Sequence, residues 1–231
     1  MIHYHGTPIT PREQLLRMAG RHFCVSFSEP RDLDTCLRIG QSVMLDNGAF
    51  SAFTRGAAFD LAGYYGWLEP VLAHPHWAVV PDVIDGPEAE QIAMLRSWPF
   101  AAELAAPVWH LGLPIDYLLW LADHWPRICF GSSAAYWDVG SPAWCGRMDE
   151  AFNALARRRG SLPWVHGLRM LGQAGERWPL ASADSTNVAQ NHKRDTGCAE
   201  CKAATLDAIQ CRADWEAMPL QIGLMLGGSD G

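Results

Sequence analysis

Polar side chains follow a series of short apolar runs in this 231-residue chain, each at the point where the run ends. The run at residues 43–45 stops at Asp46 and then turns through Asn47 and Gly48. A continuous apolar run of this length, bounded by turn residues, predicts a strand that is buried on both faces. Strand ends that each deliver one reactive side chain are typical of the site of a parallel α/β enzyme. Further runs end on Asp82, His110, Ser132 with Ser133, His166 and Asp184.

The three acids Asp46, Asp82 and Asp184 are the side chains best suited to chemistry, because the ends of parallel strands meet at one mouth. Carboxylates gathered there can act as a nucleophile, as a general acid or base, or as acceptors for the N–H groups of a base. An Asp at a single strand end can equally cap the next helix. A histidine in an aromatic-rich wall is often only a hydrogen-bonded core residue. The further strand-end candidates are His5, Asp85, His110 and His166.

Eight short apolar runs alternate with helical patterns, and this count favours a closed (β/α)8 barrel of the TIM type over an open sheet. We expect strands near residues 2–5, 23–27, 43–46, 77–81, 107–110, 128–131, 164–167 and 180–184. We expect helices near residues 11–20, 32–39, 59–73, 115–123 and 147–158, one that opens at Gly86-Pro87-Glu88, and a last one at 200–213. These elements form one compact barrel domain over residues 1–222, followed by a flexible tail at 223–231.

Composition narrows the function classes. The formal net charge is −7 and only 19% of residues are charged, which argues against a surface coated with phosphate-binding lysines but not against a local basic patch. No GxGxxG motif follows a strand and no P-loop occurs, so no nucleotide cofactor is expected. Seven cysteines, an odd number, in a chain without a signal peptide predict a reducing, cytoplasmic location. No apolar run approaches the length needed to cross a membrane, so no membrane partner is expected.

Five short segments together resemble the successive motifs of the tRNA-guanine transglycosylase family. They are LDNGAF (45–50), VPDVIDG (80–86), FGSS (130–133), VHGLR (165–169) and SADSTN (182–187). The chain is most similar to the small phage and bacterial members that insert deazaguanine bases into DNA. The resemblance covers most of the chain in the right order, although each motif is short. It implies a barrel that breaks a base–sugar bond and exchanges guanine for a 7-deazaguanine.

The resemblance also implies roles for single residues. Asp184 matches the aspartate nucleophile that attacks the anomeric carbon, and Asp46 matches the acid that handles protons and contacts the base. Asp82 matches the acid that accepts the purine N1–H and the exocyclic amine, and a carboxylate can accept both donors at once. The chain departs from the family at Ala49 and Ser51, where the family has Gly and Gln, so recognition near Asp46 can differ. The remaining substrate-binding candidates from the matched motifs are Phe50, Gly131, Ser132, Ser133, His166 and Gly167.

The family also has a zinc site of three Cys and one His after the nucleophile strand. Here Cys198 and Cys201 keep the Cys-x-x-Cys spacing, but the preceding Cys is absent. His192 and Cys211 would complete a tetrahedral set, and thiolates with an imidazole are typical zinc ligands. The alternative is a reduced pair without metal. We therefore expect either a structural zinc or a reduced, metal-free cysteine pair at this place.

The sequence thus predicts a glycosyltransferase that exchanges guanine for a 7-deazaguanine through a covalent aspartyl–sugar intermediate. DNA is favoured over tRNA as the nucleic-acid partner, and a free deazaguanine base is the second substrate. Two rivals keep the fold: a hydrolase that uses water, and an enzyme acting on a nucleoside or nucleotide. A third rival is a non-catalytic barrel that binds bases or nucleic acid. The sequence is compatible with a homodimer but does not determine the oligomeric state.

Overall fold

The computed structural model describes residues 1–159, 161–175 and 177–217, with the side chain of Arg159 left out. The described residues form a single parallel sheet, in which every neighbouring pair of strands runs in the same direction. Its strands are β1 (Ile2–Gly6), β2 (His22–Ser26), β3 (Ser42–Asp46), β4 (Trp77–Val79), β5 (Ala105–Ala106), β6 (Val108–His110), β7 (Arg127–Gly131), β8 (Trp164–Gly167) and β9 (Ser182–Ser185).

The sheet closes on itself through Pro107. The strand order is β5-β4-β3-β2-β1-β9-β8-β7-β6, and only Pro107 separates the two end strands β5 and β6 in the sequence. Val80 N donates to Ala106 O (3.0 Å), and Cys129 N donates to the Pro107 carbonyl oxygen (2.8 Å). Because proline has no N–H to give to a ladder, it splits one strand into two segments, each paired on one side. The result is the (β/α)8 barrel that the sequence predicts.

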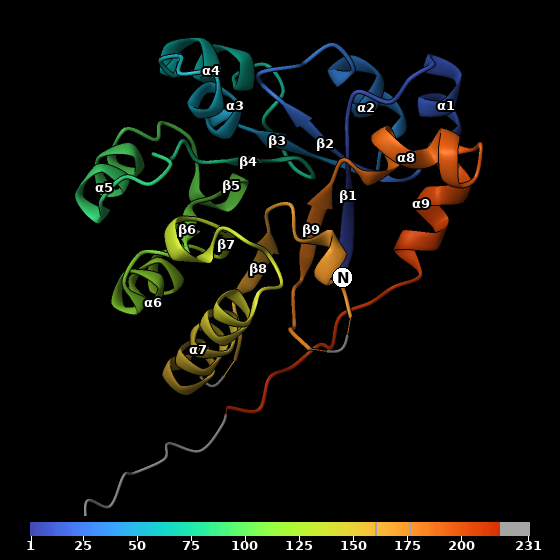
Figure 1. Cartoon of the computed structure of the whole chain (residues 1–231). Helices are drawn as coiled ribbons and strands as arrows, with labels where there is room; N and C mark the ends of the chain where they lie inside the picture. The colour runs from blue at the N-terminus through green and yellow to red at the C-terminus, as the bar shows by residue number, and fades with distance from the viewer. Residues whose placement is uncertain (160, 176, 218–231) are drawn as a thin grey trace, which may run out of the picture.

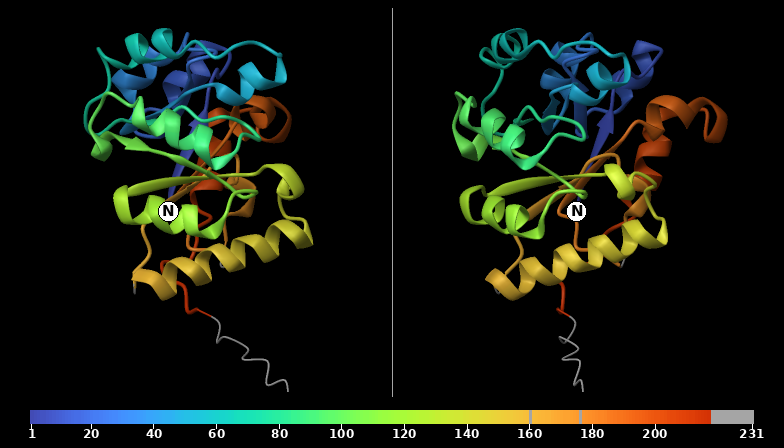
Figure 2. Two further views of the ribbon diagram at one scale, coloured as in Figure 1. Left: turned by 90° about the vertical axis from the view of Figure 1, so that its left-hand side faces the viewer. Right: turned by 60° about the vertical axis from the view of Figure 1, so that its left-hand side comes forward.

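Helices lie outside the strands (Figure 1). They are α1 (Arg12–Arg17), α2 (Leu33–Ile39), α3 (Ala49–Thr54), α4 (Leu61–Leu68), α5 (Glu88–Arg96), α6 (Ile115–His124), α7 (Pro142–Arg159), α8 (Asn187–Asp195) and α9 (Ala199–Asp207), with 3-10 turns η1 (Ala102–Leu104), η2 (Ala134–Tyr136) and η3 (Leu171–Gln173). The long α7 packs beside α6 along the outside of the barrel (Figure 2), and α8 and α9 pack against β1. The C-terminal helix is thus present, as α9.

Two helices are absent from the sequence prediction. α3 begins directly after the turn at Asn47 and Gly48, and α8 begins at Asn187 and carries mostly polar residues. α3 is too short, and α8 has too few apolar residues, for either to stand out in a search for apolar repeats. The predicted helix at 147–158 also begins earlier in the structure, at Pro142.

Strand alternation sends every second side chain into the barrel. The inward set forms its own apolar cluster: Tyr4, Cys24, Met44, Trp77, Val79, Ala106, Val108 and Cys129. The outward side chains join two further clusters under the helices, one around α6 and α7 and the other around α1, α2, α4 and α9. Apolar side chains therefore fill the middle of the interior, and the strand-end acids lie beyond them at the C-terminal ends.

Within the described ranges, no helix has the length and apolar character needed to cross a membrane. The end of the predicted barrel domain at residue 222 and the predicted tail from Gly223 fall outside the described residues.

Candidate active site

The three strand-end acids lie at the C-terminal mouth of the barrel. Asp46 is the last residue of β3, Asp184 lies inside β9, and Asp82 lies three residues beyond β4. None of them caps the helix that follows, which removes the simplest structural role for these acids. The N-cap residues of α3, α5 and α8 are Gly48, Pro87 and Thr186.

Asp184 is held by one of its two oxygens. Its Oδ1 accepts the backbone N–H of Arg169 (2.7 Å) and lies 3.3 Å from Nε2 of His166. Within the described part of the chain, no hydrogen bond reaches Oδ2. The residue is 8% exposed, whereas His166 is completely buried beneath it. Asp184 therefore presents one oriented, uncommitted oxygen, as a nucleophilic carboxylate requires.

Asp82 is held by both oxygens. Asn47 Nδ2 donates to Oδ1 (2.8 Å), and His110 Nε2 lies 2.8 Å from Oδ2. Nδ1 of His110 is buried and finds no partner among the described residues. A Cβ on Gly131 would lie 3.2 Å from this nitrogen, so the glycine allows the imidazole to fit beside β7. Asp82 is thus a rigid acceptor, oriented for donors on a ligand.

The environment of Asp46 shifts the pKa of its carboxyl group. Burial raises the pKa of Asp46 from 3.8 to about 6, and a hydrogen bond from Ser26 only partly offsets this rise. The negative charges of Asp184 and Asp82 raise the pKa further. Its Oδ2 also accepts the backbone N–H of Gly48 (3.1 Å). A carboxyl group that titrates near neutral pH suits a general acid and base.

An aromatic and cationic stack forms at the rim beside these acids. The guanidinium carbon of Arg169 lies 3.6 Å from the centre of the Phe50 ring, and this ring lies 5.7 Å from that of Trp137. Arg169 has a left-handed backbone (φ 60°), which directs its own N–H at Asp184. Trp137 is 48% exposed. The Phe50 ring therefore contacts a cation and lies near an indole, close to the nucleophile candidate.

The two serines after β7 use their hydroxyl groups within the protein. Ser132 Oγ accepts Trp144 Nε1–H (2.9 Å), and Ser133 Oγ accepts the backbone N–H of Gly112 (3.3 Å). Ser133 is 2% exposed and Ser132 is partly buried. These contacts fix the loop that follows Gly131 at the mouth.

Gly167 packs on the outer side of the barrel wall. A Cβ there would lie 2.8 Å from Cβ of Met170 and 3.2 Å from Leu180 Cδ1. We expect Gly167→Ala to lower the free energy of unfolding by about 1–3 kcal/mol, because the contact is with a rigid part of the neighbouring side chain. Urea unfolding measures this change. Gly172→Ala is the matched control, since a Cβ there meets nothing within 4 Å. Equal effects of the two substitutions would contradict the packing role.

His5 and Asp85 do not join the acids. Tyr4 points into the barrel, so its neighbour His5 points outward, where Nε2 lies 2.9 Å from Asp207 on α9. Asp85 is exposed, and its Oδ1 accepts the backbone N–H of Ala134 (3.2 Å), which links two rim loops. Strand parity and loop packing therefore explain both positions without catalysis.

A separate cavity of about 220 Å³ lies near the beginning of β1, away from the acids. Asp207 contacts Arg21 and the histidines of β1 there. Burial acts to raise the pKa of Asp207, but these partners outweigh it and hold the pKa well below its ordinary value. The cavity is lined by Met1, Ile2, His3, Gly20, Arg21, His22, Gln41, Asp207 and Gln210.

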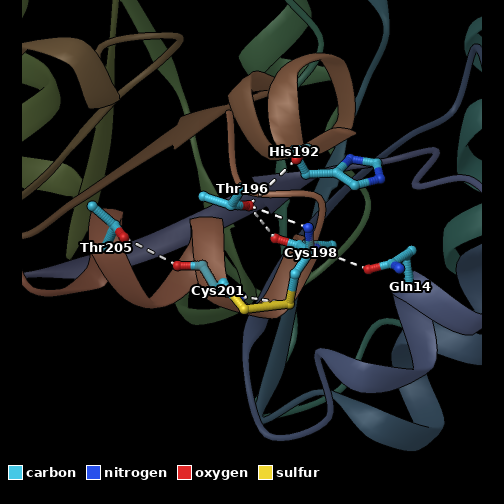
Figure 3. Close-up of a disulfide and its surroundings, with 7 residues drawn as sticks. Gln14, His192, Thr196, Cys198, Cys201 and Thr205 are labelled. Atoms are coloured by element: carbon cyan, nitrogen blue, oxygen red, sulfur yellow. Dashed lines mark hydrogen bonds between the residues drawn. A yellow bond between two sulfur atoms is a disulfide. The ribbon is translucent and has the colours of Figure 1, made fainter. Parts of the chain in front are cut away.

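The predicted zinc ligands are not brought together. Cys198 and Cys201 form a disulfide at the start of α9, and the ring of His192 is turned away from the two sulfur atoms (Figure 3). His192 Nδ1 hydrogen-bonds to the carbonyl oxygen of Val188 (2.8 Å). Cys211 packs against the cluster around α6 and α7, whereas α9 joins the other outer cluster. Among the described residues, no group of three or more His, Cys, Asp or Glu side chains is placed to hold a metal ion. The residues present do not fit the zinc site implied by the resemblance.

Three contributors to the mouth are not singled out by the sequence pattern: Asn47, Ser26 and Arg169. Asn47 is 3% exposed, donates to Asp82 and accepts Ala49 N–H. Asn47 comes directly after the candidate Asp46 in the sequence, and this position could have marked it as a residue that supports the site. The roles of Ser26 and Arg169 depend on contacts between distant strands and loops, which no local pattern carries.

Comparison of the chain with protein-family models, with curated proteins and with solved structures finds no match.

Proposed function

We propose that this protein is a nucleobase transglycosylase that replaces guanine in DNA, or secondarily in tRNA, with a free 7-deazaguanine base. The proposal rests mainly on one observation: the three acids at the barrel mouth have three different environments. Asp184 has one free oxygen, Asp82 is held as an acceptor, and Asp46 has a pKa of about 6. The resemblance of the five motifs supports the same assignment.

In the first half of the proposed reaction, Oδ2 of Asp184 attacks the anomeric carbon of the sugar. The bond from this carbon to guanine N9 breaks, and its electron pair goes to the base. Protonated Asp46 gives its proton to the departing guanine, so the base leaves neutral. The sugar then stays bound to Asp184 as an ester.

In the second half, the ionised Asp46 takes a proton from the incoming deazaguanine base. The nitrogen of that base attacks the anomeric carbon, and Asp184 leaves as a carboxylate. Two displacements at one carbon retain its configuration. No water is consumed, and the acid and base forms of Asp46 are each used once per cycle.

Base recognition is proposed to rest on Asp82 with Phe50. A guanine edge offers N1–H and an amine, and a fixed carboxylate accepts both. Adenine has an N1 lone pair and a C2–H in these two positions, so it would leave that carboxylate unpaired, which is a strong basis for rejection. Phe50, backed by Arg169, offers an aromatic face against which a base released from its stack can pack.

The test is a base-exchange assay with radiolabelled guanine placed in DNA, in tRNA or in free guanosine, with an unlabelled 7-deazaguanine base as acceptor. We expect label release from DNA to exceed release from tRNA and to depend on the added base. Release that proceeds equally without the acceptor would favour a hydrolase. Release from guanosine alone would favour a nucleoside enzyme, and no release from any of them would leave a non-catalytic binding barrel.

A further inference from the structure

A chain of buried hydrogen bonds runs inside the barrel from β8 to Asp184. Trp164 Nε1 donates to Ser182 Oγ (2.9 Å), and Ser182 Oγ lies 2.8 Å from Nδ1 of His166. Nε2 of His166 in turn lies 3.3 Å from Oδ1 of Asp184. Ser182 and His166 are completely buried and are direct partners in the register of β8 and β9. The two middle members of the chain are therefore shielded from water, whereas Trp164 at its start is only partly buried.

The groups at the two ends of this series of hydrogen bonds determine which atom donates in each bond. An indole N–H can only donate, and an ionised carboxylate can only accept. If the Ser182 hydroxyl hydrogen points at Nδ1, neutral His166 must carry its proton on Nε2 and donate to Asp184. The opposite tautomer would place the Nε2 lone pair against an Oδ1 lone pair. The ring also packs edge-on against Tyr4 and Trp77, with centroids 5.8 and 5.1 Å away, so rotation of the ring is restricted.

We propose that His166 is a positioning residue whose tautomer is set by Ser182 and Trp164, and that it holds Asp184 Oδ1 so that Oδ2 faces the substrate. This inference rests on the proposed function of Asp184 as nucleophile. His166 touches neither the sugar nor the base. It acts as the orienting partner of a reactive side chain, on the opposite side from the substrate.

The hydrogen bonds to Oδ1 also bear on the second half of the reaction. When Asp184 leaves the sugar, negative charge returns to its oxygens, and two N–H donors at Oδ1 stabilise that charge. Loss of the His166 donor should therefore slow the breakdown of the ester, and loss of the orientation it gives to Oδ2 should slow the formation of the ester. Substrate affinity should change little, because His166 lies beneath the carboxylate.

The first test is independent of activity. Nitrogen NMR of histidine-labelled protein distinguishes an N–H nitrogen from a bare one. We expect Nε2–H and a bare Nδ1 for His166 in the wild type, and a mixture of tautomers in Ser182→Ala. A wild-type His166 with its proton on Nδ1 alone would contradict the proposed direction of the hydrogen bonds, and this result would not depend on any measurement of activity.

Ser42→Ala is the matched control. Ser42 is a buried serine on β3 whose Oγ lies 2.7 Å from Nδ1 of His22 and 3.1 Å from Tyr4 Oη, so it also bridges one histidine and one aromatic side chain. In the described part of the chain, neither of these partners hydrogen-bonds to an acid at the mouth, and Tyr4 meets His166 through ring packing alone. Both variants remove one buried hydroxyl, so a loss of stability alone should affect them alike.

The kinetic test measures adduct formation on guanine-containing DNA in a single turnover. We expect Ser182→Ala to slow it about tenfold at unchanged half-saturating DNA concentration, with Ser42→Ala close to the wild type. His166→Gln, which keeps an N–H donor, should recover part of the rate lost in His166→Leu. Equal rates in Ser182→Ala and Ser42→Ala would overturn the positioning role. A wild type that forms no adduct would refute the proposed function. The tautomer measurement would still show whether Ser182 sets the tautomer of His166.

Discussion

Replacing Asp184 with Asn is expected to abolish the covalent protein–DNA adduct and to slow base exchange by at least about 10⁴-fold. The change keeps the shape of the side chain, and its Oδ1 can still accept Arg169 N–H. An amide oxygen, however, is a far weaker nucleophile than a carboxylate. The adduct is measured by denaturing gel and by intact mass after incubation with guanine-containing DNA.

The control for this variant is Asp123→Asn. Asp123 forms a surface ion pair with Arg158 (3.0 Å) outside the barrel, and a surface pair contributes little to stability. We expect its adduct yield to match the wild type. A full adduct yield in Asp184→Asn would contradict the nucleophile assignment and would move attention to the other two acids.

The second large effect concerns Asp46 and pH. Because its pKa is about 6, the proposed mechanism predicts opposite pH dependence in the two half-reactions. Adduct formation uses protonated Asp46 and should fall as the pH rises above about 6. Adduct release by the incoming base uses ionised Asp46 and should fall as the pH drops below about 6. Rapid-mixing measurements of each half between pH 4.5 and 8 check this.

Asp46→Asn should remove both pH dependences and slow adduct formation by about 10²–10⁴-fold, because the amide can neither give nor take the proton. Its half-saturating DNA concentration should change much less than its rate. A variant that keeps the pH profile of the wild type would contradict the assignment of Asp46 as the acid and base.

The same substitution is expected to stabilise the fold above pH 6. The folded protein binds the Asp46 proton more tightly than the unfolded chain, so stability falls as the pH rises from about 3.8 to about 6. The gap between these pKa values corresponds to at most about 3 kcal/mol. Asp46→Asn carries no such charge, so urea unfolding at pH 7.5 should show a gain, and the two proteins should converge near pH 4. A loss of stability at pH 7.5 would show that the ionised carboxylate is not strained in the fold.

The local sequence was enough to predict the fold class of this protein. Strands such as β2, β3, β4 and β7 are short, mainly apolar runs, and burial on both faces leaves this signature in the amino acids themselves. The alternation of runs with helical patterns is enough to predict the (β/α)8 barrel, and the residue after each run marks the mouth. The sequence pattern does not predict the split at Pro107: it predicts one strand at 107–110, whereas the structure has β5 before the proline and β6 after it.

Only the tertiary structure decided which polar groups work together. His5 and Asp184 both lie at strand ends, yet the register sends one to α9 and the other into the barrel. The proposed zinc ligands are likewise not brought together, since Cys211 lies close to the other cysteines in sequence but packs in a different cluster. The raised pKa of Asp46 and the buried chain through His166 arise from groups far apart in the sequence, whose burial and distances exist only once the barrel has closed.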